Sequence, residues 1–171
     1  MTKMNRRWLR NSLLIFSILF ISLVIYGIFL YMDLNEERTK GFSKTQRDLI
    51  QQTSITDIEK IEKFNGEQAY HVVYGKTEDG SEKIIFYPLA GSEKQLTTVD
   101  ADEILPESKM IGMWQSECPS CQLVKATPAL LDNELLWELV YYDEENHYVF
   151  DYRSIYDGSH YEDIRYLRQF N

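Results

Sequence analysis

The first pattern along the chain is an apolar stretch from Leu13 to Met32, twenty residues without a charged side chain. At about 1.5 Å per residue it forms a helix of about 30 Å, which matches the hydrocarbon thickness of a bilayer. A cleavable signal peptide has an apolar region of about 7 to 15 residues and a small-residue cleavage site. This stretch ends instead in Phe29-Leu30-Tyr31-Met32-Asp33. We therefore predict an uncleaved transmembrane helix at residues 13–32.

The segment that follows the span is polar, with few apolar positions. Asn35 to Thr53 is predicted to form a juxtamembrane helix that is interrupted or begins near Gly41. Ile55 to Phe64 is ambiguous, because its isoleucines follow a helical period while the Asn65-Gly66 turn suits a strand.

Two later segments carry the pattern of a β-hairpin. Ala69 to Gly75 is rich in β-branched and aromatic residues, and Asp79-Gly80 is a turn signal. Lys83 to Leu89 returns as the second strand, with Pro88 marking a strand end or an edge. His71 in the first strand is expected to point to solvent or across to a neighbouring strand.

The rest of the chain predicts a helix followed by an antiparallel sheet. Pro106 falls either in the first turn of the helix or between it and a short preceding turn. Alternation places Leu135, Trp137, Leu139 and Tyr141 on one face of a strand, and Tyr148, Phe150 and Tyr152 on one face of the next. The predicted elements are a helix at Asp100 to Glu117 and strands at Gln122 to Thr127, Leu135 to Tyr142, His147 to Tyr156 and about Tyr161 to Leu167.

Similar residues recur 67 positions apart in the two halves of this outer part, which indicates a duplication. We expect an α+β arrangement in which each half lays a helix across a curled antiparallel sheet and packs on the other half. The recurring pairs are Tyr70 and Trp137, Val73 and Val140, Tyr74 and Tyr141, Gly91 and Gly158, and Ser92 and Ser159.

Charge adds an orientation to this picture. The basic side chains before the span are followed by Asp33, Glu36 and Glu37 after it, so the positive-inside rule places the N-terminus in the cytoplasm. The 139 residues beyond the span carry a net charge of −13, with 14 basic and 27 acidic side chains. That acidity excludes nucleic acid as a partner and repels anionic wall polymers. The basic residues before the span are Lys3, Arg6, Arg7 and Arg10.

A basic tail, one anchor and the sequences IEKFNGEQAYHVVYGKTEDG and LLWELVYYDEENHYVFDY resemble the TseB-like, formerly YpmB-like, membrane proteins of Gram-positive bacteria. The resemblance covers nearly the whole chain and is most specific at Tyr70 to Tyr74 and Leu135 to Tyr141. It implies two tandem cystatin-like domains of PepSY type. The expected divisions are a cytoplasmic tail at 1–12, the transmembrane helix at 13–32, a juxtamembrane helix and first domain at 33–99, and a second domain at 100–171.

The same resemblance implies a non-enzymatic regulator of cell-wall elongation. Its partner would be a class B penicillin-binding protein, a peptidoglycan transpeptidase, met at the outer face of the membrane. Family members have no known catalytic constellation, so no catalytic, cofactor-binding or metal-binding residue is carried over. Whether a small wall-derived ligand is also bound is left open.

Cys118 and Cys121 form a C-x-x-C pair that is not part of the family pattern. The pair follows a predicted helix, where the dipole and Glu117 disfavour a thiolate, and lacks the strand-then-helix context of a thioredoxin. Outside the cytoplasm a disulfide closing the turn is the first interpretation. Two reduced thiols and a working redox site remain alternatives. One C-x-x-C with scattered histidines is weak support for zinc.

The sequence offers a few candidates for partner contacts. Tyrosines crowd the second half, where they fill a sheet core or form a recognition surface. Tyr142 lies opposite Trp137 and Tyr141 on its strand and is the better interface candidate. Within the span, Ser22 and Gly27 are small residues able to approach another helix.

Two rival functions stay open at this stage. One is a PepSY-like inhibitor of an extracytoplasmic peptidase, and the other is a thiol-disulfide enzyme that uses Cys118 and Cys121. Acidic clusters such as Asp143 to Glu145 lack the spacing of a calcium loop, and no serine-nucleophile elbow occurs in the sequence.

Overall fold

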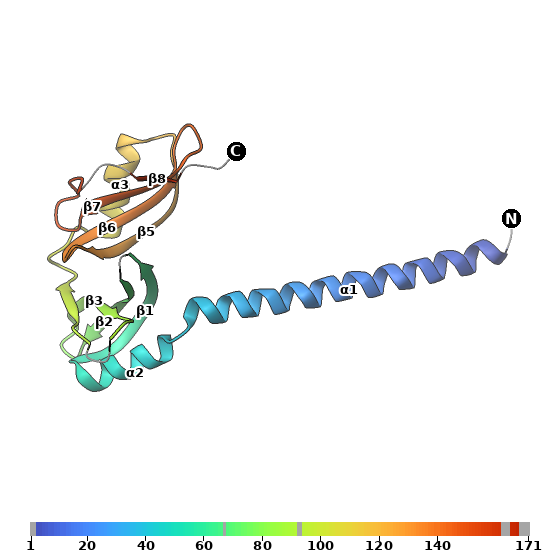
Figure 1. Cartoon of the computed structure of the whole chain (residues 1–171), viewed down its shortest axis with the longest axis horizontal. Helices are drawn as coiled ribbons and strands as arrows, with labels where there is room; N and C mark the ends of the chain where they lie inside the picture. Colours follow the sequence, from blue (N-terminus) through green and yellow to red (C-terminus); the bar gives the residue numbers. More distant parts are fainter. Residues whose placement is uncertain (1–2, 67, 92–93, 162–164, 168–171) are drawn as a thin grey trace. The chain divides into compact units, whose positions relative to one another are not determined.

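The computed structural model describes residues 3–66, 68–91, 94–161 and 165–167. Internal contacts divide the chain into Met1–Gly41 and Phe42–Asn171, which are described separately. In sequence order (Figure 1) the elements are α1 (Lys3–Thr39), α2 (Phe42–Gln52), β1 (Ile55–Asn65), β2 (Ala69–Thr77), β3 (Glu82–Pro88), β4 (Thr97–Asp100), α3 (Glu107–Glu117), β5 (Gln122–Leu131), β6 (Glu134–Tyr142), β7 (Tyr148–Ser154) and β8 (Arg165–Leu167).

The long helix α1 ends just before Gly41, which has a φ of +85°. Residues with a Cβ rarely adopt this left-handed conformation, so glycine is the usual residue where a helix stops. The helix α2 then begins at Phe42. The expected interruption near Gly41 is confirmed.

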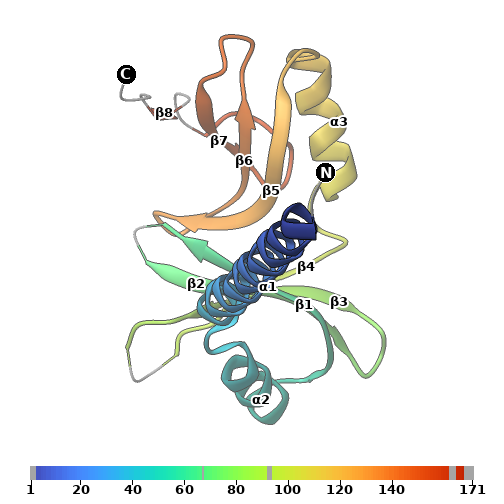
Figure 2. The same cartoon turned by 90° about the vertical axis from the view of Figure 1, so that its right-hand side faces the viewer.

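The first sheet is an antiparallel meander in the order β1-β2-β3-β4. The ambiguous segment from Ile55 is a strand, and the predicted hairpin is confirmed as β2 and β3. The helix α2 covers one face of this sheet, as Figure 2 shows. Leu49 of α2 is buried there in a small core with four residues of the sheet: Ile55, Val73, Ile85 and Tyr87.

The opposite face of the first sheet is also buried. Val72, Ile84 and Phe86 join a larger core that includes Leu131 and Trp137 of the second half. The middle strands β2 and β3 are therefore covered on both faces, by α2 on one side and by the second half on the other.

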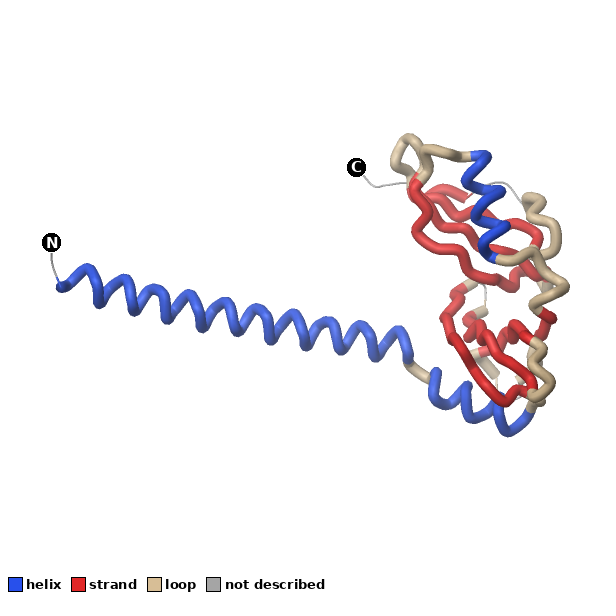
Figure 3. The backbone as a smooth tube through the Cα atoms, turned by 180° about the vertical axis from the view of Figure 1, so that it is seen from behind, coloured by secondary structure: helices blue, strands red, loops and turns tan. Residues whose placement is uncertain are grey.

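The second sheet repeats the meander in the order β5-β6-β7-β8, with α3 packed on one face (Figure 3). Met110 and Trp114 of α3 are buried, and the Trp114 ring lies 5.2 Å from that of Tyr141. The predicted last strand is confirmed at Arg165–Leu167, which pairs with β7. Residues 162–164 of that prediction lie outside the described residues.

The faces covered by helices match at an offset of 66 residues, not the 67 expected from the recurring residue types, because Val73 packs with Leu49 of α2 while Tyr141, on the face opposite Val140, meets Trp114 of α3. Tyr74 pairs with Ile84 in the first hairpin, and Val140 pairs with Phe150 in the second. Because side chains alternate between faces, one residue of shift moves each to the other face. Val73 therefore corresponds to Leu139 rather than Val140. The predicted match of Ser92 with Ser159 lies outside the described residues, since Ser92 is not among them.

The helix predicted from Asp100 begins later, at Glu107. Asp100 belongs to β4, where it pairs with Lys83. Pro106 lies at the N-cap and its carbonyl accepts from the Met110 N–H at 3.0 Å, because proline suits the start of a helix and not its interior.

The strand predicted at Gln122 to Thr127 extends to Leu131. It includes Pro128, which is tolerated because β5 is an edge strand. The α+β class and two antiparallel sheets are confirmed. The cystatin-like nature of each half and the boundaries 33–99 and 100–171 stay predictions.

We expect Leu139→Ala to lower the free energy of unfolding by about 2–5 kcal/mol, because it leaves a cavity in the core beneath α3. Leu139 is 0% exposed, whereas Val124 is 50% exposed. Val124→Ala serves as the control, with an expected change within about 0.5 kcal/mol. Urea unfolding of the full chain in detergent, followed by tryptophan fluorescence, measures both. Equal losses in the two variants would contradict the packing.

Candidate interaction surface

The helix α1 is the first candidate contact element. From Trp8 to Glu36 it is long and apolar enough to cross a membrane, and none of this stretch is buried within the chain. Its 29 residues span about 44 Å at 1.5 Å each, more than the ~30 Å hydrocarbon core. The helix can therefore anchor the protein, with its aromatic ends at Trp8 and Tyr31 near the interfaces.

Ser22 and Gly27 both lie on the exposed surface of α1. Five residues of helix rotate the side chain by about 140°, so the two positions face different directions. A Cβ placed at Gly27 would have no atom within 4 Å, so this glycine leaves an open notch on the helix. The role of Ser22 and Gly27 as partner contacts stays a prediction.

The second candidate is the face of the second sheet that α3 leaves uncovered. It bears four half-buried aromatic side chains, and we call it the aromatic face: Tyr142, Tyr148, Phe150 and Tyr152. The Tyr148 ring lies 5.1 Å from that of Tyr142 and 5.4 Å from that of Phe150, both edge-on. The expected placement of Tyr148, Phe150 and Tyr152 on one face is confirmed.

A charged pair lies within the aromatic face. The Tyr152 hydroxyl donates to Glu138 at 2.8 Å, and Lys125 binds the other oxygen of the same carboxylate at 2.6 Å. Glu138 is 4% exposed, so these bonds offset the cost of burying its charge. The pair was not foreseen from the sequence, although a charge between Trp137 and Leu139 was a visible signal.

Tyr142 lies at the end of this row, while Trp137 and Tyr141 on the opposite face are buried, 1% and 6% exposed. Phenolic rings give a large contact area and a polar tip at small entropic cost, which is why tyrosine is common at protein interfaces. The aromatic face thus has the composition of a protein-recognition surface. Contact through Tyr142 itself stays a prediction.

Of the two orientations expected for His71, the one toward solvent is wrong, and its ring instead stacks on that of Tyr87 in the neighbouring strand β3, with the ring centres 6.5 Å apart. His71 is 1% exposed under α2, where its Nδ1 lies 2.7 Å from the Thr45 hydroxyl and its ring meets Phe42 edge-on at 4.8 Å. The error arose because the sequence does not show which face of the strand a helix covers. His71 and Val73 lie on the same face of β2, and α2 covers both.

A second polar contact joins α2 to the sheet. The Tyr87 hydroxyl donates to Asp48 at 2.6 Å, and Lys44 binds the same carboxylate oxygen. Hydrogen bonds from Lys44 and Tyr87 hold the pKa of the Asp48 carboxyl below its usual value. These contacts fix α2 on the first sheet.

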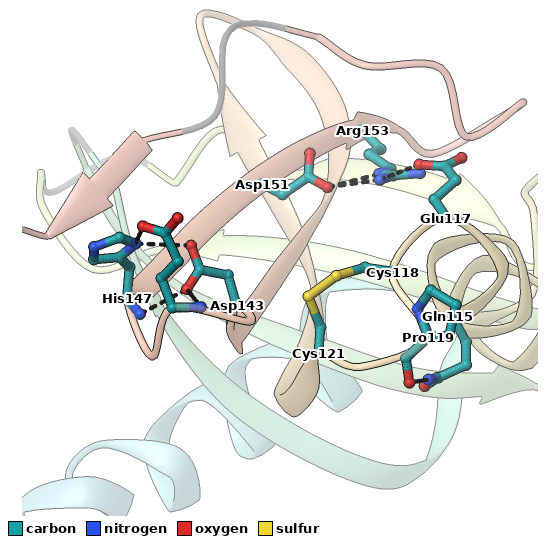
Figure 4. Close-up of a disulfide and its surroundings, with 10 residues drawn as sticks. Gln115, Glu117, Cys118, Pro119, Cys121, Asp143, His147, Asp151 and Arg153 are labelled. Atoms are coloured by element: carbon teal, nitrogen blue, oxygen red, sulfur yellow. Dashed lines mark hydrogen bonds and ion pairs between the residues drawn. A yellow bond between two sulfur atoms is a disulfide. The ribbon is translucent and has the colours of Figure 1, made fainter.

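Cys118 and Cys121 are joined by a disulfide that closes the turn between α3 and β5 (Figure 4). Cys118 is the C-cap residue of α3, and its N–H donates to the Trp114 carbonyl at 2.9 Å. Cys121 is 7% exposed and belongs to the main core. The bond therefore lies at a helix C-terminus with one sulfur buried, a position suited to a structural staple.

A buried ion-pair network lies beside the disulfide. Arg153 is 2% exposed and binds Asp151 and Glu117, each at 2.8 Å (Figure 4). His160 adds a contact to Asp151 at 3.2 Å. The network was not foreseen from the sequence, although Asp151 and Arg153 share the core face of β7 with Val149. The hydrogen bond from Arg153 lowers the pKa of the Glu117 carboxyl.

The acidic turn at Asp143 to Glu145 is organised by its own backbone. The Asp143 carboxylate accepts hydrogen bonds from the N–H groups of Glu145 and His147 at 2.9 and 2.7 Å. Its role is therefore to hold the turn, as aspartate side chains commonly do. Among residues 3–66, 68–91, 94–161 and 165–167, no group of three His, Cys, Asp or Glu side chains is placed to hold a metal ion.

Comparison with known proteins adds three findings. Residues 49–88 match the family model of the cell wall elongation regulator TseB-like domain. The chain is 24% identical over 144 residues to the probable cell wall elongation regulator TseB of Bacillus subtilis (strain 168), covering 84% of this chain and 89% of the relative. The solved structure of the YpmB protein from Bacillus subtilis has a TM-score of 0.66 at 22% identity, covering 75% of this chain and 98% of that one.

The family model, the curated relative and the solved structure all support a TseB/YpmB-like family.

The matched family segment, residues 49–88, runs from the end of α2 through β3. It thus contains the hairpin whose two faces are covered by α2 and by the second half. The resemblance expected at Tyr70 to Tyr74 falls within this segment. The aromatic face and the disulfide lie outside the segment.

We expect the double substitution Cys118→Ser, Cys121→Ser to lower the free energy of unfolding by about 2 kcal/mol, as loop closure over four residues predicts. A reductant should lower the stability of the native protein by a similar amount and leave the double variant unchanged. Urea unfolding with and without dithiothreitol measures both. An equal effect of reductant on the two proteins would exclude the staple.

The Glu117 carboxyl gives a pH prediction. Its pKa is lower in the folded protein than the ordinary 4.5, so its pairing with Arg153 stabilises the fold above that pH and is lost as pH falls through the folded pKa. Glu117→Gln should lower stability at neutral pH and flatten the loss on acidification. The unfolding midpoint, followed from neutral pH to about pH 3, tests this. Glu144→Gln, at an exposed turn position, should keep the native pH profile.

Proposed function

We propose that this chain is a non-enzymatic, membrane-anchored regulator of cell-wall elongation that binds a class B penicillin-binding protein at the outer face of the membrane. The match with the TseB regulator over 84% of this chain and 89% of the relative is the observation that carries the regulatory role. The partner is inferred from the family resemblance. Contact would be made through α1 and through the unit Phe42–Asn171, which the proposal places outside the cytoplasm and which is called the outer unit.

The anchor supports this role by a concentration argument. Two proteins held in one membrane meet at a high effective concentration, so a modest contact surface suffices for association. The aromatic face supplies such a surface, and α1 supplies a second contact within the lipid. Basic residues before the span and acids after it support an N-terminus in the cytoplasm and an extracytoplasmic outer unit.

The two rival functions are weaker on these observations. The disulfide joins a helix C-terminus to a strand, whereas thiol-disulfide enzymes activate a thiolate at a helix N-terminus. The double variant that lacks Cys118 and Cys121 tests this rival directly. An unchanged wall phenotype and no reductase activity with a model disulfide would remove it. A PepSY-like inhibitor predicts a peptidase partner instead.

In-cell photo-crosslinking tests the proposal. A photoreactive residue at Tyr142 should capture a class B penicillin-binding protein, because this position lies on the aromatic face. The same residue at Lys109, exposed on α3 at the opposite side of the sheet, is the matched control and should capture less of it. Mass spectrometry of the adducts measures the difference.

Two outcomes would overturn the proposal. Capture of an extracytoplasmic peptidase in place of a wall synthase would favour the inhibitor. If a reporter fused behind residue 171 were found in the cytosol, the outer unit would lie on the wrong side of the membrane for wall synthesis.

A further inference from the structure

A cavity of 280 Å³ opens between the first sheet and the loop that leads into α3. Its apolar lining includes Ile84, Ile104 and Trp137, which are 3%, 7% and 1% exposed and belong to the main core. The volume lies just below the roughly 300–1,000 Å³ of typical ligand pockets, so it suits one long side chain better than a cofactor.

Three carboxylates line the same cavity: Glu59, Glu82 and Glu107. Glu59 and Glu82 share a single ammonium, that of Lys76, at 2.5 and 3.0 Å. Lys83 is engaged by Asp100. Glu107, in the first turn of α3, makes no ion pair among the described residues. The lining carboxylates and the ion-pair partners around them comprise five carboxylates, Glu59, Glu62, Glu82, Asp100 and Glu107, and three ammonium groups, Lys60, Lys76 and Lys83, so two negative charges are in excess.

Tyr74 lies in the cavity wall, close enough to the carboxylates to be affected by their negative charge. Burial raises the pKa of its phenol, and the charges of Glu62 and Glu107 raise it further. The ammonium of Lys60 lies 5.1 Å from the centre of the Tyr74 ring. A cation is therefore already accommodated against this ring by the chain itself.

We propose that this cavity is the docking pocket for a lysine or arginine side chain from an extracytoplasmic segment of the partner protein. The methylene stem of such a side chain packs on Ile84, Ile104 and Trp137 while its charged head remains at the wet carboxylate rim. The excess of negative charge selects a basic segment and disfavours acidic ones. This inference rests on the proposed function in requiring a protein partner, and it names the second surface that this partner meets.

The experiment uses the full chain in cells, with a photoreactive residue in place of Ala101 at the cavity wall. The crosslinked peptide of the partner, identified by mass spectrometry, should carry a lysine or arginine beside the linkage. Adding Glu107→Lys should lower the adduct yield about two- to fivefold, the range for a partly exposed charge pair. Glu107→Gln should give a smaller loss in the same direction.

Glu144→Lys is the matched control, because it makes the same change of charge at an exposed turn outside the cavity. Its adduct yield should equal that of the chain that carries only the photoreactive residue at Ala101. To separate charge from folding, the identified basic residue of the partner is changed to glutamate, which should restore the adduct with the Glu107→Lys chain. Failure of this restoration overturns the pocket.

The remaining outcomes separate this claim from the proposed function. If Tyr142 captures a wall synthase while Ala101 captures nothing, or captures a segment without lysine or arginine, the pocket is wrong and the function stands. If both positions capture a peptidase and the yield at Ala101 still depends on Glu107, the function is wrong and the pocket stands. Equal loss with Glu144→Lys contradicts the pocket.

Discussion

The unit Phe42–Asn171 depends on one dry contact, the burial of the second face of the first sheet against the second half. Val72, Ile84 and Phe86 meet Leu131 and Trp137 there in a single core. The Trp137 indole N–H donates to the Leu105 carbonyl at 3.0 Å, which also fixes the loop that enters α3. The cavity beside this loop and the orientation of α3 both follow from this contact, because interiors at close-packed density do not deform gradually.

The two halves share a meander and a covering helix, yet they use the opposite face of the sheet differently. At the 66-residue offset, Val72 corresponds to Glu138, so an apolar position that joins the halves becomes a charged one in the second sheet. Glu138 needs Lys125 and Tyr152 to satisfy its oxygens, and a face with such a pair at its centre resists dry packing. The face that joins the two halves in the first sheet therefore has a charged group at its centre in the second sheet.

Charge and anchoring act together in the proposed role. The acidic outer unit is repelled by anionic polymers, so what approaches it closely must be neutral or basic. Confinement to a membrane removes much of the entropic cost of association with another anchored protein. Under these conditions the notch at Gly27, the aromatic face and an acidic pocket need only moderate individual affinities.

The sequence by itself determined the features that depend on local period and composition. In a charge-free run of twenty apolar residues the backbone hydrogen bonds are satisfied in a helix, either in lipid or in a buried core. The β-branched and aromatic residues on either side of Asp79-Gly80 predict one hairpin. The resemblance to the TseB-like family was likewise visible in the sequence, and the family model matches the segment that contains Tyr70 to Tyr74. Tertiary structure decided what depends on which face is covered. His71 is buried because α2 covers its side of β2, Asp100 joins a strand because Lys83 lies opposite it, and Arg153 is enclosed beside Glu117. Alternation shows that a strand has two faces, but only the packing of distant elements decides which one meets water.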